Sequence, residues 1–156
     1  FQQETSPFTI GVMIVGFVII ASLHLITAFK ERKIDNVKTK EKNGWFEVCN
    51  VLEIEDDRAK IFTVDNERVA IFKYDGKLSA IHNECKHQGG PLGEGKIIDG
   101  CITCPWHGYQ YLPHNGQSPP PFTEKVSTYE LKLEVRTVYI NPNAFAEGTE
   151  IEPCKI

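Results

Sequence analysis

The chain has 156 residues, five cysteines and a formal net charge of −4. This length suits one modest domain with an appendage and excludes two sizeable domains. From residue 43 onward, 17 Asp and Glu outnumber 11 Lys and Arg, and such an acidic balance argues against nucleic acid as a partner. Because residue 1 is not Met, we expect the chain to be processed or longer at this end.

Residues 8–29, FTIGVMIVGFVIIASLHLITAF, run for 22 positions without a charged side chain. A helix of that length reaches roughly 33 Å, which matches the hydrocarbon core of a bilayer. A buried core helix is disfavoured because no other segment is apolar enough to surround it. A signal peptide is disfavoured because Glu4 is the only charge upstream. The sequence therefore predicts an N-terminal tail over 1–7 and one membrane-spanning helix over 8–29, in which His24 is the costly polar residue.

A basic run follows the predicted helix. Residues 30–42, KERKIDNVKTKEK, hold six Lys and Arg against three acids and show little apolar periodicity. We interpret 30–43 as a polar tether. The positive-inside rule then predicts that the rest of the chain lies on the cytoplasmic or matrix-like side. The sequence thus favours a single-pass protein in the lipid bilayer of a mitochondrial inner membrane or a bacterial plasma membrane.

The remainder has the patterns of β-strands. Residues 129–136, YELKLEVR, alternate strictly, with Leu131, Leu133 and Val135 on one face, as in a half-exposed strand. Further strands are predicted at 60–64, 68–74 and 77–82. Asp75-Gly76 between the last two is a hairpin turn signal. No segment after residue 43 has a helical period over ten residues, so the sequence predicts a small antiparallel β-rich fold.

Two short glycine-rich segments each contain one cysteine and one histidine. The first, CKHQGG, holds Cys85 and His87; the second, CPWHGYQY, holds Cys104 and His107. Two thiolates and two imidazoles suit either a tetrahedral zinc ion or a [2Fe–2S] cluster of mixed ligation. Zinc fingers usually pair Cys with Cys and His with His, whereas here each segment supplies one of each. The surrounding glycines would let backbone amides approach the sulfur atoms closely.

At these residues the sequence resembles the Rieske iron–sulfur family, whose motif is C-x-H followed, after a stretch of similar length, by C-x-x-H. The resemblance covers residues 44–141 and leaves a C-terminal tail over 142–156. It implies an all-β fold, namely a small antiparallel β-sandwich with a cluster-binding subdomain, here preceded by a single transmembrane α-helix. It also implies a [2Fe–2S] cluster in which Cys85 and Cys104 ligate one iron and His87 and His107 ligate the other.

Departures within the motif indicate a branch of the family. Cytochrome bc-type Rieske subunits carry an extra cysteine in each segment, and these form a disulfide; Gly90 and Trp106 stand at those positions. Tyr109 replaces a serine that hydrogen-bonds a bridging sulfur, whereas Tyr111 matches a tyrosine that contacts a ligand cysteine. Fewer hydrogen bonds to sulfur predict a potential in the lower half of the family range of roughly −150 to +300 mV. The sequence resembles the ferredoxin-type branch.

The other cysteines and histidines are interpreted as structural. Cys101 precedes Cys104 by three residues, but we expect it to be a core thiol. We expect Cys49 to pack beside Trp45 and Cys154 to lie in the polar tail. A disulfide between two of these three stays open, since sequence does not show proximity. Surface or hydrogen-bonding roles are expected for two histidines, His82 and His114. Residues 119–121, PPP, resemble the proline loop that covers the cluster in Rieske domains.

The favoured function is a membrane-anchored Rieske-type protein that passes single electrons as a subunit of a larger respiratory or other membrane redox complex. Its partners would be the other subunits of that complex and a protein electron donor or acceptor. One alternative is the Rieske subunit of a quinol:cytochrome c oxidoreductase, which the missing disulfide disfavours. Another is the ferredoxin partner of a membrane oxygenase. An oxygenase needs two further histidines and a carboxylate for a second iron, and His114 is the only histidine after His107. We therefore expect no catalytic activity from the chain alone.

Overall fold

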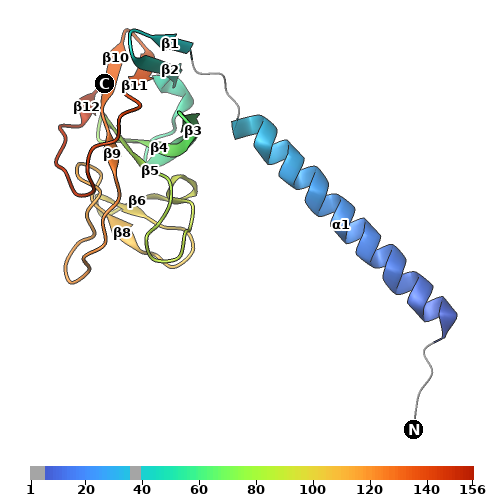
Figure 1. Ribbon diagram of the computed structural model, residues 1–156. Helices are drawn as coiled ribbons and strands as arrows, with labels where there is room; N and C mark the ends of the chain where they lie inside the picture. Colours follow the sequence, from blue (N-terminus) through green and yellow to red (C-terminus); the bar gives the residue numbers. More distant parts are fainter. Residues whose placement is uncertain (1–5, 36–39) are drawn as a thin grey trace. The chain divides into compact units, whose positions relative to one another are not determined.

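The computed structural model describes residues 6–35 and 40–156, with side chains over 6–29 and 43–156. Internal contacts divide the chain into two compact units, Phe1–Asn36 and Val37–Ile156. The described part of the first consists of one helix, and the second is built of β-strands, the loops that join them and two short 3₁₀ turns (Figure 1).

Helix α1 spans Pro7–Asp35 and includes the predicted membrane segment. Its stretch Pro7–Phe29 is long and apolar enough to cross a membrane. The helix continues six residues past Phe29, so the predicted tether is helical in its first part. Lys, Glu and Arg are good helix formers, and neither glycine nor proline interrupts residues 30–35. The remainder of the predicted tether includes 36–39, which lie outside the described residues.

The second unit contains three sheets in which every strand pair is antiparallel. The first sheet has the order β1 (Lys40–Lys42), β2 (Trp45–Asn50), β11 (Thr137–Ile140), β10 (Leu131–Glu134). The second has the order β12 (Cys154–Lys155), β5 (Lys77–His82), β4 (Glu67–Tyr74), β3 (Arg58–Val64), with β9 (Thr128–Tyr129) also paired to β5. The third has the order β6 (Lys96–Ile98), β7 (Cys101–Thr103), β8 (Gln110–Tyr111). Two 3₁₀ turns, η1 (Val51–Glu53) and η2 (Leu92–Glu94), complete the unit. The predicted all-β fold class is confirmed.

The hairpin of β4 and β5 is formed as predicted. Its register pairs Tyr74 with Lys77 and Val69 with His82. Asp75 and Gly76 form the two-residue turn, with φ values of +45° and +67°. Backbone twist in such turns matches the twist of the flanking strands, and glycine adopts a positive φ without steric cost.

Strand β4 is buried on both faces, which explains its continuous apolar run. Val69 and Ile71 point into a core between the first and second sheets, together with Leu78 and Val138. Residues on the opposite face pack against the third sheet and form a second core, which includes Ala70, Phe72, Ile81, Leu92, Ile102 and Tyr111. Full burial of one such large apolar side chain contributes about 1.5–3 kcal/mol. The second core is the base on which the cysteine- and histidine-bearing loops are built.

The predicted strand over 129–136 is broken in the structure. It is split into β9 and β10 around Glu130, and Val135 is 98% exposed in the turn before β11, with a φ of +60°. Leu131 and Leu133 do pack against the first core as expected. The prediction that Val135 shares their buried face is wrong. The last pair between β10 and β11 joins Glu134 to Thr137, so Val135 lies in the turn between the two strands.

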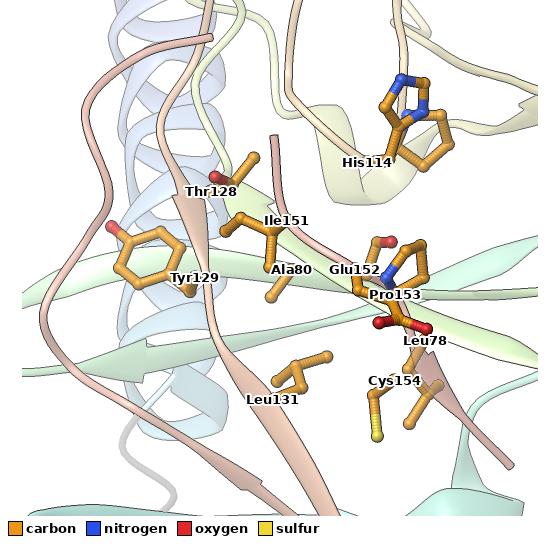
Figure 2. A pocket seen from close by; sticks show the side chains of 12 residues that line it. Leu78, Ala80, His114, Thr128, Tyr129, Leu131, Ile151, Glu152, Pro153 and Cys154 are labelled. Carbon is orange, nitrogen blue, oxygen red and sulfur yellow. The ribbon is translucent and has the colours of Figure 1, made fainter. Parts of the chain in front are cut away.

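Residues 142–156, predicted as a tail, return to the second sheet. Strand β12 pairs Cys154 with Leu78, and the Ile151 amide donates to the His114 carbonyl oxygen at 2.9 Å. Figure 2 shows Ile151 and Cys154 beside Leu78 and Ala80, around a pocket of about 10 Å³. That volume is no larger than one water molecule. Cys154 is therefore packed against the first core and not held in a polar tail, because backbone pairing draws this short segment onto an open sheet edge.

Candidate metal centre

Two loops carry the predicted ligands, and their backbones are closed in the same way. The first loop (residues 85–90) follows β5, and the second loop (residues 104–109) joins β7 to β8. In the first, Cys85 N–H donates to Gly90 O and Gly89 N–H donates to Cys85 O, at 2.9 and 2.8 Å. In the second, Cys104 N–H donates to Tyr109 O and Gly108 N–H donates to Cys104 O, at 2.8 and 3.0 Å.

Glycine is required at the same point of each loop. Gly89 and Gly108, each four residues after the cysteine, have φ values of +72° and +70°. This left-handed conformation is costly for residues that have a Cβ atom. The pattern of Cys, His and Gly in the sequence therefore encodes two copies of one turn.

The loops meet with cysteine beside cysteine. Cys85 and Cys104 are 2% and 3% exposed and belong to the second core. Burial raises the pKa of the Cys104 thiol, and the adjoining Cys85 thiol raises it further. Metal binding at the Cys104 sulfur atom must therefore displace a proton from a buried thiol.

The histidines also lie side by side, but at the surface. The ring centroids of His87 and His107 are 5.1 Å apart, with the rings at 89° to each other. Both residues are exposed. Each loop thus directs its sulfur inward and its imidazole outward.

The donor set is arranged as two pairs. Over residues 6–29 and 43–156, whose side chains the structure describes, no three Cys, His, Asp or Glu side chains gather as a site for one metal ion. A [2Fe–2S] cluster with two sulfur donors on one iron and two nitrogen donors on the other needs such separate pairs. The residues present fit that cofactor.

Tyr111 contacts Cys85, as the resemblance implied. Its hydroxyl oxygen lies 3.4 Å from Cys85 Sγ and accepts the Lys86 N–H at 3.0 Å. Because the oxygen already accepts a hydrogen bond, its own proton is available to the sulfur. Burial raises the pKa of Tyr111, so the phenol stays protonated.

Gly90 and Trp106 face each other across the loops, at the two positions that carry a disulfide in the cytochrome bc-type branch. A methyl group on Gly90 would lie 2.9 Å from Cys104 Sγ and 3.1 Å from the Trp106 ring. The loops are thus held in contact here by close packing of the indole against backbone.

We expect Gly90→Ala to weaken cluster retention, because its methyl group must displace both Cys104 and Trp106. Overpacking of this kind typically costs about 1–3 kcal/mol. The measurements are iron per chain after gel filtration and the melting temperature. Gly100→Ala is the control for iron content: its methyl group meets no neighbour within 4 Å, and its φ of +76° strains the backbone away from the cysteine loops, so it should lower the melting temperature without loss of iron. Equal iron content in the two variants would contradict this packing role.

Sequence reasoning missed two residues of the proline loop (residues 118–124). Phe122 packs on Tyr109 with ring centroids 4.9 Å apart, and Glu124 accepts a hydrogen bond from the Tyr109 hydroxyl. The pKa of Tyr109 is raised to about 12, mainly by burial and then by Glu124. The same hydrogen bond lowers the pKa of Glu124, so at neutral pH a phenol donates to a carboxylate. Neither residue has a motif that would have identified it.

The remaining cysteines lie apart from the two pairs. Cys101 is half-buried in β7 and Cys49 is buried in the first core. Burial raises the pKa of Cys101 and raises that of Cys49 to about 11. Both thiols are therefore protonated, and Cys49 is a core thiol, whereas Cys101 belongs to neither core.

Two histidines outside the loops make contacts with acidic side chains. His82 Nε2 lies 3.1 Å from a Glu67 carboxylate oxygen, and His114 Nε2 lies 4.0 Å from one of Glu150. These contacts agree with the surface roles predicted for both histidines.

Comparison with known proteins identifies the domain. Residues 44–130 match the Rieske [2Fe-2S] domain family. The biphenyl dioxygenase ferredoxin subunit of Pseudomonas sp. (strain KKS102) is 32% identical over 96 residues, which are 60% of this chain and 87% of that protein. The cholesterol 7-desaturase nvd 1 of Ciona intestinalis is 31% identical over 103 residues, or 64% of this chain, but the match spans only 22% of that longer protein.

Solved structures share the fold. The ferredoxin of carbazole 1,9a-dioxygenase from Nocardioides aromaticivorans IC177 superposes with a TM-score of 0.58 at 21% identity, over 62% of this chain and 96% of that one. The family match contains both loops, the proline loop and Tyr111, and it spans more than half of the chain. The chain belongs to the Rieske [2Fe-2S] family, and its β-domain is a Rieske-type electron carrier that binds a [2Fe–2S] cluster.

Proposed function

We propose that this protein is a membrane-anchored Rieske ferredoxin that passes single electrons as a subunit of a larger membrane redox complex. Cys85 and Cys104 hold one iron of the cluster, and His87 and His107 hold the other. The cluster, when bound, supplies one-electron redox chemistry.

One observation carries this proposal: the cysteine pair is buried and the histidine pair is exposed. Cys85 and Cys104 are 2% and 3% exposed, whereas both imidazole rings are at the surface. A partner protein therefore approaches the site from the histidine side, while the second core keeps water from the sulfur atoms.

The anchor is helix α1. Its apolar side chains are distributed all round the helix and are not confined to one face, as expected for a helix that lies in lipid. We assign the bilayer segment to 8–29, the Rieske domain to 44–141 and the intervening residues to a basic connection. The basic flank orients the domain toward the cytoplasmic or matrix-like side.

A ferredoxin that serves a membrane oxygenase is the second candidate. The names of the relatives favour it, since the biphenyl and the anthranilate 1,2-dioxygenase proteins are both ferredoxin subunits. The quinol:cytochrome c oxidoreductase role is weaker, because Trp106 packs on Gly90 where that branch carries a disulfide.

Gentle detergent extraction followed by size exclusion separates these roles. We expect the chain to co-elute in a fixed ratio with haem- or flavin-containing membrane subunits, and to be reoxidised by that fraction. Elution as a free protein that reduces an oxygenase with its own mononuclear iron would instead support the second candidate. If the reduced chain transferred electrons neither to the membrane subunits nor to the oxygenase, both candidate functions would be wrong.

A further inference from the structure

We propose that Glu124 is a positioning residue for the histidine side of the cluster. Its carboxylate holds the Tyr109 hydroxyl, so that the Tyr109 ring lies flat on His87 and fixes the orientation of that imidazole. The same hydrogen bond ties the proline loop to the second loop. This inference rests on the proposed ligand role of His87.

Tyr109 lies at the junction of three loops. Its backbone carbonyl accepts from Cys104 N–H within the second loop. Its ring stacks on His87 of the first loop, with centroids 5.3 Å apart and planes at 11°. Phe122 of the proline loop and Tyr111 of β8 contact it as well, at 4.9 and 5.6 Å between ring centroids. An aromatic ring held by three neighbours leaves the imidazole little freedom to rotate.

Glu124 is itself held by the backbone of its own loop. Ser118 N–H donates to Glu124 O at 2.9 Å, and Phe122 N–H donates to Pro119 O at 3.1 Å. Thr123 N–H donates to Glu124 Oε2 at 3.0 Å, the same oxygen that accepts the Tyr109 hydroxyl. These bonds within its own loop hold the Glu124 carboxylate in place independently of Tyr109. A charge-assisted hydrogen bond to a fixed acceptor is stronger and more directional than a neutral one.

Glu124 could act on His87 through its hydrogen bond to Tyr109 or through its negative charge alone, and substitutions distinguish these two effects. Tyr109→Phe removes the hydroxyl but keeps the stacked ring and the charge. Glu124→Ala removes the acceptor and the charge, whereas Glu124→Gln removes the charge but keeps an acceptor oxygen. Glu147→Gln is the matched control. It removes a carboxylate that pairs with Lys86 of the first loop at 2.6 Å. Glu147 makes no contact with Tyr109 among the described interactions.

The experiment uses the full-length, cluster-loaded protein in detergent micelles. Pulsed EPR of the reduced protein measures the couplings of the two histidine nitrogens, and hydrogen exchange measures the amides of the non-proline residues in the proline loop, Ser118, Phe122, Thr123 and Glu124. We expect Tyr109→Phe and Glu124→Ala to shift one nitrogen coupling and to speed exchange in the proline loop by about tenfold, which corresponds to about 1.4 kcal/mol of local stability. Glu124→Gln should largely restore both signals, and Glu147→Gln should match the wild type.

Unchanged couplings and exchange in Tyr109→Phe would overturn the positioning role. Tyr109→Phe retains the aromatic packing, so this outcome does not depend on whether Glu124→Ala folds. Equal shifts in Glu124→Gln and Glu124→Ala, with none in Tyr109→Phe, would also overturn it in favour of a charge effect alone. A wild-type protein without two histidine couplings would refute the proposed ligands instead, so the two failures are distinguishable.

Discussion

Replacing Cys104 with alanine removes the cluster and destabilises the β-domain. Cys104 is 3% exposed and lies in the second core, so its loss deletes a proposed ligand and leaves a small cavity. Loss of a structural metal site is among the largest effects of a single substitution. We expect a loss of about 3 kcal/mol or more, and therefore a melting temperature lower by more than about 10 °C. Iron and sulfide content, visible absorption and thermal unfolding measure the effect.

Cys101→Ala is the matched control for that substitution. Cys101 precedes Cys104 by three residues and imitates a CxxC ligand pair, but it lies half-buried in β7. The variant should keep two irons per chain and lose stability only modestly. Loss of iron from Cys101→Ala, with retention in Cys104→Ala, would reverse our assignment of the ligands.

We expect two arginines introduced into helix α1 to release the protein from membranes, because α1 is the proposed anchor. Val15 and Val18 are near the middle of the apolar stretch, and each is exposed over more than half of its surface. An arginine at the centre of a membrane helix costs about 2.5–3.5 kcal/mol on insertion scales. We expect Val15→Arg/Val18→Arg to move the full-length chain from the carbonate-washed pellet to the supernatant. Because α1 and the β-domain are separate compact units, the cluster absorption should persist.

The control keeps the helix apolar. Val15→Leu/Val18→Leu preserves hydropathy and should stay in the pellet with an unchanged spectrum. Wild-type protein that washes off in carbonate would rule out a transmembrane anchor and leave α1 as a surface-bound or partner-bound helix.

Several features followed from local sequence because local physics decides them. Asp75-Gly76 formed the hairpin since two adjacent residues with positive φ suffice to reverse the chain. The apolar run over 8–29 formed one long helix, which exceeded its predicted end because residues 30–35 also favour helix.

Two predictions from local patterns were wrong because pairing between distant strands decides where Val135 and Cys154 lie. Val135 continued the strand alternation in sequence, yet the register of β10 with β11 makes it a turn residue. Cys154 appeared to belong to a polar tail until pairing with Leu78 joined it to a sheet.

The sequence by itself determined the chemistry of this protein. Residue type and spacing predicted a metal centre at Cys85, His87, Cys104 and His107, and the resemblance of these two motifs to the Rieske family implied the cofactor. Only the tertiary structure decided the environment of those residues: cysteines buried together, histidines exposed together, and Glu124 joined to His87 through Tyr109. The reason is that ligand identity is carried by short motifs, whereas burial and contacts between loops depend on segments that meet only when the chain has folded.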